Sequence, residues 1–172
     1  GMLYHVSGTS FAAPMVSGAA SLLLALDPGL SAQALRRMLL HSARDLDTPG
    51  RDIATGYGLL DVGAALDADP AFYVEAAINT VQVTKRDGRT LVQVLGTADA
   101  DAYAGAALRL GAGEAPDRWQ DAGEGPGSAV VDGLLAEIDA ARFAGAARWV
   151  IELEVAHANG ASRVARFDLK LR

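Results

Sequence analysis

Apolar positions recur with two different periods along this chain, at helical spacing before residue 70 and at strand spacing after residue 72. Between residues 10 and 26, small and bulky apolar side chains cover nearly every side of the predicted helix, and Asp27-Pro28-Gly29 ends it. A helix without a polar face is typical of the interior of a larger body. Small residues would let such a helix approach a neighbouring sheet closely, but the body that would enclose it is expected to be absent from this chain.

A second helix is predicted to begin after Ser31 as its N-cap and to run through Leu46. Its apolar residues form one stripe while its arginines lie off that stripe, which indicates an amphipathic surface helix. The polar stretch 47–55 is predicted to be a loop, followed by a strand at 56–58 and a short helix at 62–66.

Strict alternation of apolar and polar residues marks the second half of the chain, most clearly over 149–155 and 165–171. Asp87-Gly88 and Asn159-Gly160 are strong hairpin signals between such runs. About seven short strands in a hundred residues are typical of an antiparallel sandwich of immunoglobulin or fibronectin type III kind. Further strands are predicted at 81–84, 90–95, 107–110 and 128–138, and the stretch 111–127 is predicted to be an irregular loop.

The change of period places a boundary at Asp67-Ala68-Asp69-Pro70. We predict an α+β chain in which a helical segment, 1–70, precedes a β-sandwich domain, 71–172. Gly1 before Met2 is interpreted as the residue left by a cleaved expression tag.

Composition narrows the classes of partner. The chain has a net charge of −6, no cysteine and only dispersed basic residues, which gives no reason to expect nucleic acid as a partner. The longest uninterrupted apolar run, 19–26, is too short to span a bilayer, so no membrane partner and no targeting signal are predicted.

The segment 8–14 joins a candidate nucleophile to a geometry that stabilises negative charge. Gly8 permits a sharp turn, Thr9 or Ser10 can cap a helix, and Ser10 would lie where free backbone N–H groups and the helix dipole favour an oxyanion. Pro14 has no N–H for the carbonyl of Ser10, which should loosen the first turn.

The string Gly-Thr-Ser-Phe-Ala-Ala-Pro, residues 8–14, with the small-residue helix after it, resembles the segment around the active-site serine of the subtilisin-like serine peptidases. Residues 26–36 are similar to the next loop and helix of that family, and 56–66 to the glycine-rich strand and short helix that close its catalytic domain. The resemblance covers about residues 5–66. It implies that 1–70 is the C-terminal segment of a subtilisin-type α/β domain. The sandwich after it resembles, by pattern alone, the immunoglobulin-like domains appended to secreted bacterial peptidases.

The resemblance implies a chemistry for the intact parent: peptide-bond hydrolysis through an acyl-enzyme, with Ser10 as nucleophile supported by Gly8 and Thr9. The family's histidine, aspartate and oxyanion-hole asparagine lie N-terminal to the serine, and nine residues precede Ser10. The chain alone is therefore expected to be inactive. The resemblance further implies a polypeptide substrate, a secreted or cell-envelope parent, no cofactor in this chain, and calcium as an open question for the parent.

A different function class is also open. The sandwich can be a non-catalytic binding module that carries a vestigial protease segment. The exposed apolar helix 14–26 suggests, in either case, packing against the sandwich or a homo-oligomer, since a large apolar patch marks an interaction site.

The histidines and loop aspartates are interpreted as structural or surface residues, not as a catalytic base or as metal ligands. His5 lacks the His-Gly-Thr surroundings of the family's base, and His41 and His157 are interpreted as surface residues, so no metal cluster is predicted. Asp45, Asp47, Asp52 and Asp61 lack the spacing of a calcium loop.

Two features of the second half leave alternatives open. Asp99 and Asp101 suit either a calcium site or an ordinary turn. Trp119 and Tyr103 suit either a carbohydrate or peptide platform or a cover over the end of the core.

Overall fold

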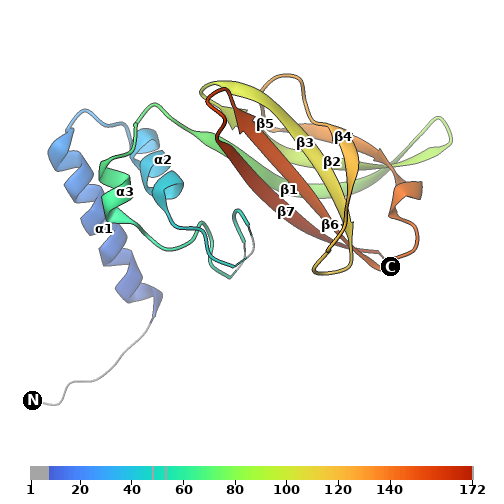
Figure 1. The fold of residues 1–172 in the computed structure, drawn as a ribbon, viewed down its shortest axis with the longest axis horizontal. Helices are drawn as coiled ribbons and strands as arrows, with labels where there is room; N and C mark the ends of the chain where they lie inside the picture. The colour runs from blue at the N-terminus through green and yellow to red at the C-terminus, as the bar shows by residue number, and fades with distance from the viewer. Residues whose placement is uncertain (1–7, 48, 53, 172) are drawn as a thin grey trace, which may run out of the picture. The chain divides into compact units, whose positions relative to one another are not determined.

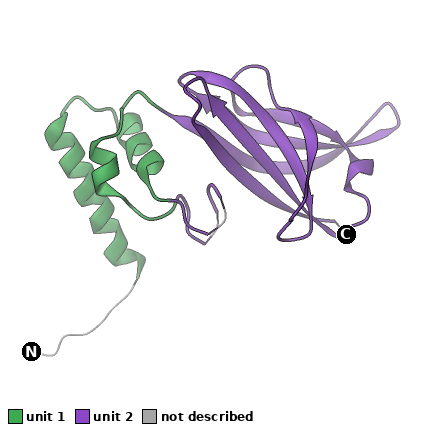
Figure 2. Ribbon diagram, in the orientation of Figure 1, with its two compact units in different colours: residues 1–44, 58–72 green, residues 45–57, 73–172 purple. Residues whose placement is uncertain are grey.

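The computed structural model describes residues 8–47, 49–52 and 54–171. Few helices and two antiparallel sheets make this an α+β chain (Figure 1). The chain forms two compact units, one of residues 1–44 and 58–72 and the other of residues 45–57 and 73–172 (Figure 2). The loop 45–57 thus lies in the same unit as the sheets, although it connects two parts of the helical unit.

The helical unit holds α1 (Thr9–Leu26), α2 (Ala32–Ser42) and α3 (Val62–Leu66). The Ser31 hydroxyl accepts a hydrogen bond from Ala34 N at 3.1 Å, which confirms the predicted N-cap of α2. The prediction that α2 runs to Leu46 is wrong. Arg44 and Leu59 exchange backbone hydrogen bonds of 2.8 and 2.9 Å, and this bridge draws the chain out of the helix.

Helix α1 is predicted correctly in its extent, and most of its large apolar side chains are exposed within this unit, as expected. Ala19 and Leu23 are its buried residues, and Leu23 packs with Met38 and Ala65 in a small core. By length and composition α1 is also long and apolar enough to cross a membrane, a test that the core helix of a soluble protein passes equally. The sequence prediction counted only uninterrupted apolar residues and so missed this property. The exposed large apolar residues of α1 are Phe11, Met15, Val16, Leu22, Leu24 and Leu26.

The second unit is built from two antiparallel sheets. One has the strand order β1-β2-β5 and the other β4-β3-β6-β7. Between β5 and β6 lies the short 3-10 helix η1 (Ala140–Phe143). The strands are β1 (Val74–Arg86), β2 (Arg89–Ala100), β3 (Tyr103–Ala112), β4 (Trp119–Glu124), β5 (Val130–Asp139), β6 (Arg148–His157) and β7 (Ser162–Lys170).

Both predicted hairpins are confirmed. Asp87 and Gly88 have φ angles of 51° and 75° in the tight turn between β1 and β2, the region that such turns require. Asn159 and Gly160 connect β6 to β7. The alternation within β6 places Ile151, Leu153 and Val155 in the core at 0% exposure, together with Leu108, Leu110 and Val94.

Two local predictions are wrong. The stretch 111–127 is not wholly irregular, because Trp119–Glu124 form β4 and pair with β3. Residues 56–58 form no extended strand. Gly56 instead makes an isolated bridge with Asp52, which turns the chain within the loop.

Candidate active-site segment

The predicted nucleophile lies at the start of the longest helix that the structure describes. Gly8 is the N-cap of α1, Thr9 is its first residue and Ser10 its second. The N-cap makes no side-chain hydrogen bond, so the suggestion that Thr9 or Ser10 caps the helix is wrong. The turn is instead closed by the backbone, with Phe11 N donating to Gly8 O at 3.0 Å. Ser10 is therefore among the first residues of the helix, whose N–H groups lack intrahelical partners.

Pro14 is accommodated inside α1 without ending it. Because proline has no N–H, it cannot donate to the carbonyl of Ser10 four residues earlier. Further along, the hydroxyls of Ser17 and Ser21 donate to the carbonyls of Ala13 and Ser17 at 3.1 and 2.9 Å. These two serines are thus engaged with their own helix. In the part of the chain that the structure describes, Ser10 is exposed and no hydrogen bond of its hydroxyl is found.

The structure does not bring a described histidine to Ser10. His5 lies outside the described residues. The ring of His41 makes an edge contact with Phe72, with the ring centroids 6.1 Å apart. His157 lies in the sandwich unit, where it is 8% exposed rather than at the surface as predicted.

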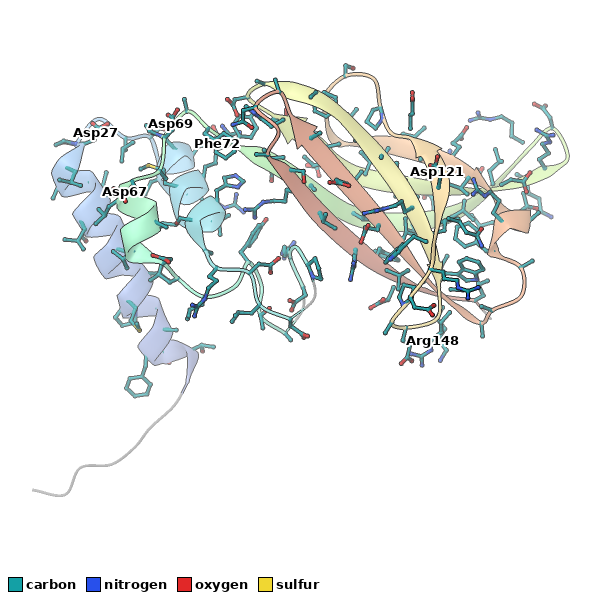
Figure 3. The ribbon with its side chains drawn as sticks, in the orientation of Figure 1. Asp27, Asp67, Asp69, Phe72, Asp121 and Arg148 are labelled. Carbon is teal, nitrogen blue, oxygen red and sulfur yellow. The ribbon has the colours of Figure 1, made fainter. Side chains whose placement is uncertain are left out.

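The loop and helix aspartates have local structural contacts. Asp61 caps α3 by accepting from Ala64 N at 2.9 Å, and Asp45 accepts from Gly50 N at 2.7 Å. Asp52 accepts hydrogen bonds from the Thr55 hydroxyl and, at 2.7 Å each, from Thr55 N and Ala54 N. The bond from the Thr55 hydroxyl, followed by those from the two backbone N–H groups, lowers the pKa of Asp52. Asp27, at the end of α1 in Figure 3, accepts from Gly29 N at 2.9 Å. Groups of three or more potential metal ligands are absent from the described residues.

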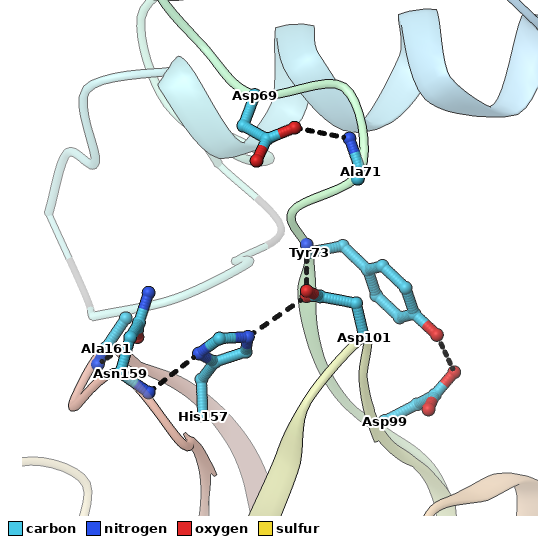
Figure 4. Close-up of polar contacts among 8 residues, drawn as sticks. All are labelled: Asp69, Ala71, Tyr73, Asp99, Asp101, His157, Asn159 and Ala161. Carbon is cyan, nitrogen blue, oxygen red and sulfur yellow. Dashed lines mark hydrogen bonds and ion pairs between the residues drawn. The ribbon is translucent and has the colours of Figure 1, made fainter.

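Asp99 and Asp101 both contact Tyr73, as Figure 4 shows. Asp101 accepts from Tyr73 N at 2.8 Å, and the Tyr73 hydroxyl donates to Asp99 at 3.2 Å. His157 Nε2 lies 3.2 Å from the same Asp101 oxygen, while its Nδ1 accepts from Asn159 N at 3.0 Å. Because Nδ1 is an acceptor, Nε2 carries the proton that faces Asp101. The N–H of Tyr73, and secondly His157, lower the pKa of Asp101.

Trp119 and Tyr103 do not form a joint platform. Trp119 pairs in register with Gly111 at one end of β3, whereas Tyr103 begins that strand opposite His157. The Tyr103 hydroxyl donates to Pro126 O at 2.6 Å, and burial raises its pKa. Both aromatic residues are therefore used separately by the fold.

A buried ion cluster in the second sheet was missed from the sequence. Glu152 is 2% exposed, and its carboxylate lies 2.5 Å from Arg109 Nη2 and 2.7 Å from Arg166 Nη2. The two arginines also lie 5.9 and 5.1 Å from the ring centroid of Trp119, which covers them where Gly111 leaves room. Alternation alone assigned Glu152 to the polar face, and no local pattern indicates that long neighbours will bury it.

Comparison with protein families finds a match in the N-terminal part of the chain. Residues 1–58 match the model of the subtilase family. The Neisserial autotransporter lipoprotein NalP of Neisseria meningitidis serogroup B is 45% identical over 68 residues, which are 40% of this chain and 6% of that protein. Fervidolysin of Fervidobacterium pennivorans is 40% identical over 62 residues, 36% of this chain and 9% of fervidolysin. The halolysin-like extracellular serine protease Nep of Natrialba magadii is 42% identical over 65 residues, 38% of this chain and 12% of Nep.

The chain thus spans about a tenth of the length of the curated relatives it matches. No solved structure gives a significant match to it.

Proposed function

Residues 1–58 are a subtilase-family segment, and from this we propose that the chain is the C-terminal portion of a subtilisin-like serine endopeptidase with Ser10 as nucleophile. The observation that carries the proposal is the family match across Gly8-Thr9-Ser10, where the structure also begins an 18-residue helix. Gly8 and Thr9 shape the turn that presents Ser10. In the intact parent, Ser10 Oγ would attack the scissile carbonyl and form an acyl-enzyme that water then hydrolyses.

The position of Ser10 suits this chemistry. At the start of a helix, free N–H groups and the positive end of the dipole stabilise the oxyanion that forms on the attacked carbonyl. A serine hydroxyl needs a base to become a good nucleophile, and no described side chain supplies one here. Loss of the base lowers turnover by roughly 10⁴-fold or more, so we propose that these 172 residues alone are inactive.

The exposed apolar side of α1 is consistent with this proposal. Such a surface marks an interaction site, and we propose that the rest of the catalytic domain covers it in the parent. A second copy of the chain is the competing occupant, and light scattering at rising concentration distinguishes the two. The protease relatives suggest a polypeptide substrate, and their autotransporter and extracellular names suggest a secreted or cell-envelope parent. The triad mechanism needs no cofactor. A calcium site would belong to the rest of the parent.

The sandwich identity is likewise a proposal. In an immunoglobulin constant domain the strand orders are ABED and CFG. The present orders β1-β2-β5 and β4-β3-β6-β7 agree, if the strands are lettered in sequence, except that the fourth strand pairs with the third instead of the fifth. We propose a fibronectin type III-like domain from this switch of the fourth strand. The alternative function, a binding module with a vestigial protease segment, requires that Ser10 be unreactive in the parent too.

A fluorophosphonate probe tests the proposed nucleophile, because it labels only an activated serine. We expect no labelling of the 172-residue chain and rapid stoichiometric labelling of a form extended through the parent's upstream catalytic region. Ser10→Ala should abolish the labelling. Ser17→Ala, two turns along the same helix, is the matched control and should retain it.

Either of two results would overturn the proposal. Rapid labelling of Ser10 in the isolated chain would show that the residues present suffice to activate it. An extended form that is folded but unlabelled would favour the vestigial segment.

A further inference from the structure

The loop 45–57 belongs to the family match by sequence but to the sandwich unit by structure. Figure 2 shows it in the colour of the sheets, while α2 before it and α3 after it are in the other colour. Both ends of the loop continue into the helical unit, so the loop is the part of the sandwich unit that joins the two in sequence. The contacts within the sandwich unit identify what holds it.

The first contact is a close approach of two backbones. Gly50 has a φ angle of 88°, and a Cβ built on it would lie 1.9 Å from the carbonyl oxygen of Val164 in β7. A side chain at position 50 is therefore excluded both by its conformation and by its neighbour. Among the described strands, β7 pairs only with β6, so it presents an edge to the loop.

The second contact comes from the preceding residue of the same strand, Arg163. The guanidinium of Arg163 lies 5.9 Å from the ring centroid of Tyr57, within reach of a cation–π interaction. Burial lowers the pKa of Arg163, and the carboxylates of Asp45 and Glu75 oppose this shift. Tyr57 is the last residue of the loop, so this contact holds the loop at the point where it rejoins the helical unit.

The loop presents these groups because it is closed on itself. The Asp45 carboxylate accepts a hydrogen bond from Gly50 N at 2.7 Å. Asp52 and Gly56 exchange backbone hydrogen bonds of 3.0 and 3.1 Å. The Thr55 hydroxyl donates to Leu46 O at 3.1 Å. A closed loop loses little conformational entropy when it docks. Arg51 also lies 5.9 Å from the Tyr57 ring, which adds to the loop's own structure.

We propose that the edge of β7 at Arg163 and Val164 is an intramolecular docking surface, and that its partner is loop 45–57 of the subtilase segment. The sandwich then acts as a brace that fixes the connection between α2 and α3. Val164 requires a glycine at the point of contact, and Arg163 requires an aromatic ring beside it. This role does not depend on the reactivity of Ser10, and its test needs no substrate.

Hydrogen exchange measured by mass spectrometry over peptides 45–57 and 162–170 tests the docking. Arg163→Ala should speed exchange in the loop by roughly 10-fold, since the cation–π contact of a half-buried guanidinium is lost. Arg89→Ala, which replaces an exposed arginine at the start of β2 in the same unit, is its control and should leave the loop unchanged.

Two glycines provide a second, independent pair of variants. Gly50→Ala adds a methyl group against Val164 and should release the loop at least as much as Arg163→Ala does. Gly56→Ala imposes the same strain, since Gly56 has a φ angle of 65°, but its Cβ meets nothing within 4 Å. Loop exchange in Gly50→Ala and Arg163→Ala that stays within about twofold of their controls overturns the proposal. Equal acceleration across every strand of the sandwich overturns it too, because Arg163 would then stabilise the sheets and not the loop.

Discussion

The two units of this chain differ most in how completely each buries its own apolar residues. The helical unit has a core of Leu23, Met38 and Ala65, with four partly buried neighbours around it. Its longest helix exposes six large apolar side chains. The sandwich instead encloses Leu108, Leu110, Ile151, Leu153, Val94 and Val155 at under 2% exposure.

The difference indicates which unit can be stable alone. Burial of apolar surface is the main favourable term in folding, and each fully buried leucine or valine contributes about 1.5–3 kcal/mol. Two facing sheets form a closed core from their own residues. The helical unit has the surface of one part of a larger domain, so its stability depends on what covers α1.

Truncating a buried leucine should destabilise the sandwich more than the helical unit. Leu153→Ala should destabilise the sandwich by about 3–5 kcal/mol, because close-packed neighbours cannot fill the cavity. Leu23→Ala should destabilise the helical unit by only about 2 kcal/mol, since its partly exposed neighbours can collapse into the space. Both tryptophans lie in the sandwich, so their fluorescence during denaturation reports that unit, while circular dichroism at 222 nm reports the helices.

The same denaturation curves show whether the two cores are independent. The tryptophan transition should move in Leu153→Ala and stay in place in Leu23→Ala. If Leu23→Ala moves both transitions equally, the two units unfold as one and their cores are not independent.

The sequence predicts most where a local pattern and the fold agree. Short stretches of sequence predict helix 9–26, the Ser31 cap and both hairpin turns, because the conformation that each stretch prefers locally is the one that it has in the fold. It fails at β4, where glycines and acidic residues indicate a loop. Pairing with β3 overrides that preference, and pairing between distant segments leaves no local pattern.

The candidate site shows the same limit. The string 8–14 identifies the segment and its helix start because motif and helix lie in one stretch of chain. The contacts of loop 45–57 with β7 join residues more than a hundred positions apart, and Gly50 looks like any loop glycine until Val164 is placed beside it. His157 was likewise assigned to the surface because its neighbours in space, Asp101 and Asn159, close over it only in the fold.

The buried carboxylate of Glu152 should contribute more to the stability of the sandwich than an exposed carboxylate beside it. Glu152→Ala should destabilise this unit by about 1.5–3 kcal/mol, because it removes charged hydrogen bonds and leaves Arg109 and Arg166 without their shared carboxylate. Glu154→Ala is the control. Its side chain is 40% exposed and 3.6 Å from Arg109, so its loss should cost less than about 1 kcal/mol. Equal losses in urea denaturation would show that burial adds nothing to this cluster.

The smallest effect is expected from Asp101, at the end of the sandwich where β2 meets Tyr73 and His157. The pKa of Asp101 is lower in the folded chain than the ordinary value of 3.8. The ionised carboxylate therefore stabilises the fold above pH 3.8, and this stabilisation is lost as the pH falls through the folded-state pKa. Asp101→Asn should therefore lower the free energy of unfolding by less than about 1 kcal/mol at pH 7, and the difference from the natural chain should shrink toward zero below pH 3.8. Asp99→Asn, which keeps an acceptor for the Tyr73 hydroxyl, is the control. A difference between Asp101→Asn and the natural chain that stays constant from pH 7 to pH 3 would mean that the hydrogen-bond geometry matters here and the charge does not.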